Sequence, residues 1–150
     1  MDKINLAIGS DHAGFELKQF LIQNLDETLH FEDLGTNNQD SCDFPDFAIK
    51  VCKFILDNEN YKGVLICGSG VGMAITANKI EGIRASNVTD IETAIQSVEH
   101  NGVNVLCLGA KNVSKELSVD IVDNFLATSF VEEKRYIRRI DKIKDLENNN

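Results

Sequence analysis

The run Ile66-Cys67-Gly68-Ser69-Gly70-Val71-Gly72 constrains this chain more than any other part of its sequence. It closes an apolar strand expected over 64–67, and a helix-like stretch over 73–79 follows it. A strand, a glycine turn and a helix start are the parts with which an α/β sheet presents backbone N–H groups to an anion. The thiol at the mouth of this turn suggests chemistry beside a bound anion. The alternatives are a tight turn for the glycines and a small buried hydrophobic residue for Cys67.

Apolar strands alternate with helical patterns along the chain. Strands are expected over 4–8, 29–34, 64–67, 83–85 and 103–108. Helices are expected over 13–25, 45–56, 73–79, 90–98, 114–125 and, highly charged, 131–146. This alternation implies parallel pairing through right-handed crossovers. We therefore expect residues 1–150 to form a single three-layer α/β/α, Rossmann-like domain with a five-stranded parallel sheet and a C-terminal helix. That helix packs either on its own domain or on a second subunit.

Composition excludes several classes of protein. The formal net charge of −9 gives no general attraction to nucleic acid or to anionic membranes. No apolar stretch reaches the roughly 18 residues that a membrane helix needs. The N-terminus, Met1-Asp2-Lys3-Ile4, lacks the pattern of a signal peptide. We expect a cytoplasmic protein that binds neither nucleic acid nor membrane.

The cysteines and the glycine run do not fit the usual metal or cofactor motifs. Cys42, Cys52, Cys67 and Cys107 show no C-x-x-C spacing and no nearby paired histidines, so we expect no metal site. The third glycine of the run comes too early for the dinucleotide motif, and the P-loop pattern is absent. We expect no cofactor.

Ligands of open parallel sheets bind at the carboxyl ends of the strands, and this rule gathers distant residues. Asp11 and His12 follow the first strand, Cys67 ends the third, and Lys111 follows the fifth. Asp11 could equally cap the next helix. His12 at a helix start is unfavourable as a cation, and a bound anion would remove that penalty.

Two further pairs are less tied to this edge. His100 and Asn101 end the helix before the fifth strand, where a histidine and an asparagine are also common for structural reasons. Arg135 and Arg139 share one face of the last helix, where they could either face solvent or clamp a phosphate.

Together these parts fit one reaction, in which a base removes a proton beside a carbonyl. Thiols at helix N-termini ionise more readily than free cysteine, which makes Cys67 a candidate base. Amides of the glycine turn would hold the enediolate oxygen, at typically about 3 kcal/mol for each good donor. A histidine would move a proton on a sugar oxygen, and cations would hold a phosphate.

Over nearly its whole length, the sequence resembles the B-type ribose-5-phosphate isomerases of the ribose/galactose isomerase family. The resemblance rests on these segments: Gly9-Ser10-Asp11-His12-Ala13-Gly14, Asp43-Phe44-Pro45, Ile66 to Gly72, Ala77-Asn78-Lys79, Gly82-Ile83-Arg84-Ala85, His100-Asn101 and Asn104-Val105. It implies interconversion of D-ribose 5-phosphate and D-ribulose 5-phosphate through an enediolate, in the non-oxidative pentose phosphate pathway, without metal or cofactor.

The resemblance also implies a role for each matching residue. Cys67 matches the base of the cysteine-using branch; the other branch has a glutamate at the position of Met73. His100 matches the residue that opens the furanose ring. Ser69 and the amides of Gly68, Gly70, Val71 and Gly72 match the part that stabilises the enediolate. Asp11 and Asn101 match the residues that contact the sugar hydroxyls. The residues that match the phosphate ligands are His12, Lys111, Arg135 and Arg139. Family members are dimers or tetramers with the active site between subunits, so a homodimer is expected here.

Three residues depart from the family pattern. Phe44 stands where many members have a tyrosine, Lys111 replaces an arginine, and Tyr136 replaces a histidine. Lysine keeps the charge but makes no bidentate fork. These changes leave one alternative, an isomerase of a hexose 6-phosphate. The glycine turn alone leaves another, a non-catalytic phosphate- or nucleotide-binding module. Cys67 and His100 together favour the ribose enzyme, which is built from one kind of subunit.

Overall fold

Five parallel strands form one sheet in the computed structural model, which describes residues 3–148. They are β1 (Asn5–Ser10), β2 (Phe31–Asp33), β3 (Tyr61–Cys67), β4 (Ala85–Asn87) and β5 (Val105–Gly109). Their order is β2-β1-β3-β5-β4, and every neighbouring pair is parallel. Ser10 pairs with Ile66, and Cys67 pairs with Gly109. The carboxyl ends of β1, β3 and β5 therefore reach one edge side by side.

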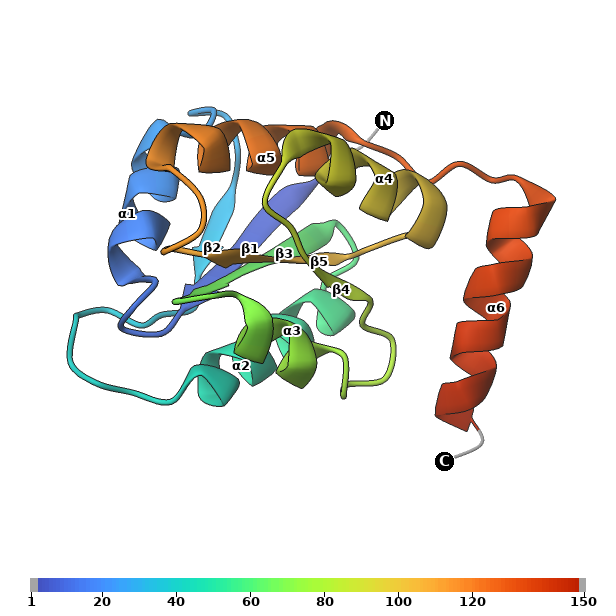
Figure 1. Ribbon diagram of the computed structural model, residues 1–150, viewed down its shortest axis with the longest axis horizontal. Helices are drawn as coiled ribbons and strands as arrows, with labels where there is room; N and C mark the ends of the chain where they lie inside the picture. Colours follow the sequence, from blue (N-terminus) through green and yellow to red (C-terminus); the bar gives the residue numbers. More distant parts are fainter. Residues whose placement is uncertain (1–2, 149–150) are drawn as a thin grey trace.

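Helices cover both faces of the sheet (Figure 1). One face carries α1 (Phe15–Asn24), α4 (Ile91–Asn101) and α5 (Lys115–Ala127), and the other carries α2 (Phe44–Asp57) and α3 (Val71–Ala77). Successive strand residues alternate between two apolar clusters, one under each layer, because their side chains point to opposite faces. The three-layer, Rossmann-like architecture expected from the sequence is confirmed.

Side-chain caps fix two of the helix starts. The Oδ1 atom of Asp90 accepts the N–H of Thr93 at 2.6 Å, and Oγ of Ser114 accepts the N–H of Leu117 at 3.1 Å. Each bond satisfies one of the free N–H groups of a helix N-terminus. Both helices begin where the sequence predicted.

The bounds of all five strands differ from those expected, and for β1 and β4 the sheet ladder gives the reason. β1 continues to Ser10 rather than ending at residue 8, because its ladder with β3 runs that far. β4 spans Ala85–Asn87 instead of 83–85, because its ladder with β5 begins at Ala85. Ile83 is instead buried in the cluster beneath α2 and α3.

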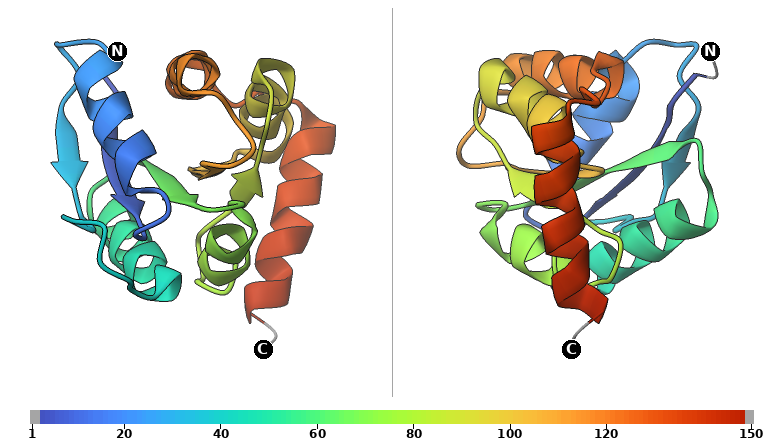
Figure 2. Two further views of the ribbon diagram at one scale, coloured as in Figure 1. Left: turned by 60° about the vertical axis from the view of Figure 1, so that its left-hand side comes forward. Right: turned by 90° about the vertical axis from the view of Figure 1, so that its right-hand side faces the viewer.

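The last helix, α6 (Lys134–Asn148), lies along one side of the layers rather than within them (Figure 2). Tyr136 and Ile140 are buried against the domain, whereas three apolar side chains of α6 remain exposed: Ile137, Ile143 and Leu146. A cavity of about 500 Å³ lies between α6 and the domain. None of the described helices has the length and apolar character needed to cross a membrane.

Candidate active site

The thiol of Cys67 lies at the carboxyl end of β3 and is held by the glycine turn that follows. The N–H of Gly70 donates to its Sγ at 3.1 Å, and only 5% of the residue is exposed. Gly70 has φ +80°, and a Cβ there would lie 2.5 Å from Oδ1 of Asn87. Glycine is therefore required for the turn that aims this amide at the sulfur.

Ser69 is held by its neighbours at the same mouth. Its Oγ accepts the N–H of Val71 at 3.2 Å, and its carbonyl accepts Nδ2 of Asn87 at 3.2 Å and of Asn112 at 3.4 Å. Two of the turn's amides, those of Gly70 and Val71, are thus already engaged. Within the described residues, the N–H groups of Gly68, Ser69 and Gly72 donate to no protein atom. Those three amides are free to hold an oxyanion.

Asp11 lies directly beside this turn, after β1. Its N–H donates to the carbonyl of Ile66 at 3.2 Å, and its Oδ1 accepts the N–H of Gly14 at 3.0 Å. A Cβ at Gly14 would lie 2.4 Å from the carbonyl oxygen of Ile66, so glycine lets α1 begin against the end of β3. The carboxyl group of Asp11 holds the turn before α1, but it does not cap the helix as the structural alternative predicted, because the N-cap of α1 is Gly14 and has no side-chain cap. The carboxyl group is also buried at the mouth.

His12 is oriented by the loop between β2 and α2. The N–H of Cys42 donates to its Nδ1 at 3.2 Å, and Sγ of Cys42 lies 3.9 Å from the same nitrogen. This contact was not foreseen from the sequence, because the two residues are 30 positions apart and meet through an irregular loop.

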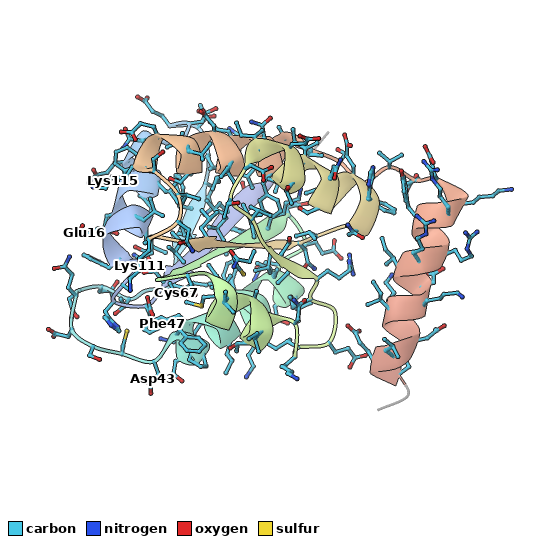
Figure 3. All side chains as sticks on the ribbon, viewed as in Figure 1. Glu16, Asp43, Phe47, Cys67, Lys111 and Lys115 are labelled. Atoms are coloured by element: carbon cyan, nitrogen blue, oxygen red, sulfur yellow. The ribbon has the colours of Figure 1, made fainter. Side chains whose placement is uncertain are left out.

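Lys111 brings a cation to the same edge. Its backbone N–H donates to the carbonyl of Gly68 at 3.0 Å, and its Nζ lies 3.8 Å from where a Cβ of Gly68 would be. Figure 3 shows Lys111 and Cys67 next to each other at the end of the molecule away from α6. Phe44 closes the other side, since a Cβ at Gly72 would lie 2.6 Å from its ring.

The remaining candidates lie at the opposite end of the sheet. His100 and Asn101 close α4, just before β5 begins at Val105, whereas Cys67 pairs with Gly109 at the end of β5. At a rise of roughly 3.3 Å per residue, the four steps of β5 alone span about 13 Å. One chain therefore does not bring His100 and Asn101 to the thiol.

Arg135 and Arg139 share the end of the molecule with His100. The ring of Tyr136 stacks on the imidazole of His100, with centroids 4.6 Å apart and planes at 18°. The guanidinium of Arg135 lies over the Tyr136 ring and donates to its hydroxyl at 2.9 Å, while Arg139 is exposed on α6. The predicted site residues thus form two groups, one around Cys67 and one where α4 meets α6.

The other buried cysteines differ from Cys67 in their surroundings. Burial raises the pKa of Cys52 to about 12, and burial also raises the pKa of Cys107. Both remain neutral thiols inside the core. Across residues 3–148, no group of three or more His, Cys, Asp or Glu side chains is placed to hold a metal ion.

Asn87 and Asn112 are supporting residues that the sequence analysis missed. Both lie at the carboxyl ends of strands, so the rule that selected Lys111 could have found them.

Comparisons with known proteins agree with this geometry. Residues 6–143 match the model of the family described as "Ribose/Galactose Isomerase". A protein of Listeria innocua named ribose-5-P isomerase B is 39% identical over 128 residues, covering 85% of this chain and 86% of its own. The solved ribose 5-phosphate isomerase of Thermotoga maritima superposes with a TM-score of 0.91 at 41% identity, covering 96% of this chain and 99% of its own. The solved type B ribose 5-phosphate isomerase of Trypanosoma cruzi superposes with a TM-score of 0.93 at 37% identity, and 99% of both chains is covered. The chain belongs to the ribose/galactose isomerase family.

Proposed function

We propose that this protein is a ribose-5-phosphate isomerase that interconverts D-ribose 5-phosphate and D-ribulose 5-phosphate in the non-oxidative pentose phosphate pathway. The observation that carries the proposal is the thiol of Cys67 at the carboxyl edge of the sheet, with the Gly70 N–H on its sulfur and Lys111 beside it. This is a base beside an anion site, in a chain of the isomerase family.

In this mechanism, Cys67 removes the C2 proton of the open-chain aldose as a thiolate. The electrons move to the carbonyl oxygen on C1, and the free amides of Gly68, Ser69 and Gly72 and the hydroxyl of Ser69 stabilise the enediolate. The proton of the C2 hydroxyl then passes to the oxygen on C1. The thiol returns its proton to C1 as the C2 carbonyl forms, which yields the ketose. Asp11 contacts the sugar hydroxyls, and His12 and Lys111 hold the phosphate.

We propose that a second copy of the chain completes the site. Ring opening needs His100. The sugar and phosphate contacts need Asn101, Arg135 and Arg139 as well. All four residues lie at the opposite end of the sheet from Cys67. A homodimer places this group of one subunit over the thiol of the other. Val71 and Ile75 of α3, beside the mouth, are 50% and 58% exposed. They offer an apolar contact to the exposed side chains of α6.

The test is the initial rate of ketose formation from ribose 5-phosphate in the presence of a chelator, for wild type and Cys67→Ala. We expect metal-independent turnover that the substitution abolishes while circular dichroism and melting temperature stay unchanged. Turnover at the wild-type rate in the variant would rule out Cys67 as the base. If wild type isomerises allose 6-phosphate but not ribose 5-phosphate, the substrate is a hexose phosphate instead.

A further inference from the structure

Arg84 holds the carbonyl groups that close α4. Its Nε lies 3.0 Å from the carbonyl oxygen of Asn101 and 3.0 Å from that of Gly102. Gly102 has φ +57° and ends the helix in the left-handed conformation. The last carbonyls of a helix have no partner within it, and a cation there also favours the helix dipole. The guanidinium therefore fixes the backbone on which His100 and Asn101 are mounted.

The main chain of Arg84 is itself held firmly. The Oδ1 atom of Asn104 accepts its N–H at 2.9 Å, and its carbonyl accepts the N–H of Asn104 at 3.0 Å. Nδ2 of Asn104 donates in turn to the carbonyl of Gly82 at 3.0 Å. Arg84 is thus anchored where β4 and β5 begin, and its side chain reaches from the sheet to the end of α4.

The guanidinium is partly withdrawn from water in this position. Burial lowers the pKa of Arg84, and the charge of Glu147 on α6 raises it, so the group stays a cation. A Cβ at Gly102 would lie 3.2 Å from its Nη2, which shows how closely the side chain packs on the helix end. From the opposite side, the Tyr136 ring stacks on His100.

We propose that Arg84 is a positioning residue for His100, and that it acts on the opening of the sugar ring rather than on proton transfer at C2. This proposal rests on the proposed function. Without the guanidinium, the carbonyls of Asn101 and Gly102 lose this donor. His100 is then held by its stacking on Tyr136 and by the remaining backbone hydrogen bonds of the helix end. A displacement of about 1 Å at a reacting group can cost on the order of 100-fold in rate.

The test separates ring opening from proton transfer. Ribulose 5-phosphate has its C5 oxygen blocked by phosphate, so it has no furanose form. Exchange of its C1 proton with deuterated solvent needs substrate binding, Cys67 and the enediolate, but no ring opening. Conversion of ribose 5-phosphate needs ring opening as well. Both rates are measured for wild type, Arg84→Met, Arg84→Lys and, as a matched control, Arg138→Met, which changes an exposed arginine of α6.

We expect Arg84→Met to lower kcat for ribose 5-phosphate by about 10-fold or more, while exchange into ribulose 5-phosphate stays within about 2-fold of wild type. Lysine can reach one of the two carbonyls, so the kcat of Arg84→Lys for ribose 5-phosphate should lie between those of Arg84→Met and wild type. Arg138→Met stays at the wild-type level in both assays. Gel filtration confirms that the variants keep the assembly of the wild type.

Equal losses in both assays would mean that Arg84 supports the whole fold or the assembly, and no loss in either would mean that it has no part in positioning. Both results overturn the proposal. A wild-type protein that neither converts nor exchanges a pentose phosphate would instead overturn the proposed function.

Discussion

The backbone N–H of Cys42 donates to Nδ1 of His12 across 3.2 Å. A ring nitrogen that accepts a hydrogen bond carries no proton, so the proton of the neutral imidazole sits on Nε2. The loop before α2 thereby turns the Nε2–H of His12 into the donor available to a ligand. In the proposed mechanism, the irregular segment between β2 and α2 therefore has a direct part in phosphate binding.

Removing that amide should weaken phosphate binding. Cys42→Pro deletes the N–H, whereas Cys42→Ala keeps it and removes only the thiol. We expect the proline variant to raise KM for ribose 5-phosphate by about 10-fold, the order expected when the Nε2–H of His12 loses its hydrogen bond to the charged phosphate. The alanine variant should match wild type. Nitrogen NMR of His12 in the wild type should show the proton on Nε2. An equal rise in KM in the alanine variant would assign the effect to the thiol.

Two glycines of the same turn should respond differently to a methyl group. Gly70→Ala places Cβ 2.5 Å from Oδ1 of Asn87 and 2.9 Å from the carbonyl carbon of Leu108, at a φ of +80°. We expect a loss of about 2 kcal/mol in the free energy of unfolding, measured in urea. In Gly68→Ala the nearest atom is Cε of Lys111 at 3.6 Å, which is ordinary contact. That variant should unfold like wild type, and equal losses would disprove the role of the backbone conformation.

The sequence was sufficient to predict one of the two groups of site residues. Asp11, Cys67 and Lys111 each follow a buried parallel strand, and the parallel ladder brings such residues to one edge whatever their separation in sequence. His100 and Asn101 follow no strand, so this rule does not place them. The pattern of α6 shows an apolar stripe but does not say which surface it covers. The contact between Cys42 and His12 depends on an irregular loop whose path has no sequence period.

An ion pair between buried Lys18 and partly exposed Asp33 holds the start of that loop. Lys18 is fully buried, and its Nζ lies 2.7 and 2.8 Å from the carboxylate oxygens of Asp33, which also accepts the N–H of Gly35. Asp33→Asn would leave the buried ammonium without a countercharge. Because Asp33 is partly exposed, we expect a cost of about 2 kcal/mol in the free energy of unfolding, between the values for exposed and buried pairs. Replacing Lys18 by Met in the same chain should recover part of this loss. Asp141→Asn, at an exposed position, is the control. An unchanged urea midpoint in Asp33→Asn would contradict the argument.

Lys62 should make stability depend on alkaline pH. Burial lowers its pKa from the ordinary 10.5 to about 8, although its ammonium donates to the carbonyls of Phe125 and Thr128. Between those two pH values the unfolded chain binds more protons than the folded chain, so stability rises with pH in this window. The difference in unfolding free energy between wild type and Lys62→Met should therefore increase from pH 8 to 10.5. For Lys53→Met, at an exposed position, the difference in unfolding free energy from wild type should not change with pH. If the difference for Lys62→Met also stays constant, the pKa of Lys62 is not lowered.

A composite site between subunits predicts that two inactive variants restore each other. Cys67→Ala and His100→Asn each damage one of the two groups, and each homodimer has two broken sites. Unfolding and refolding an equal mixture makes half of the dimers hybrid. One site of each hybrid then has both substitutions and the other has neither. We expect activity to return to about a quarter of the wild-type value, because half of the dimers have one intact site of two.

The control is the same mixture without unfolding, in which subunits have not been exchanged and activity should stay at the level of the single variants. A site contained in one chain would give no recovery after refolding, because every chain in the mixture has one substitution. Recovery therefore depends on Cys67 of one subunit meeting His100 of the partner subunit. The ends of β3 and α4 lie at opposite edges of the sheet in each chain, so only a second copy can supply that meeting.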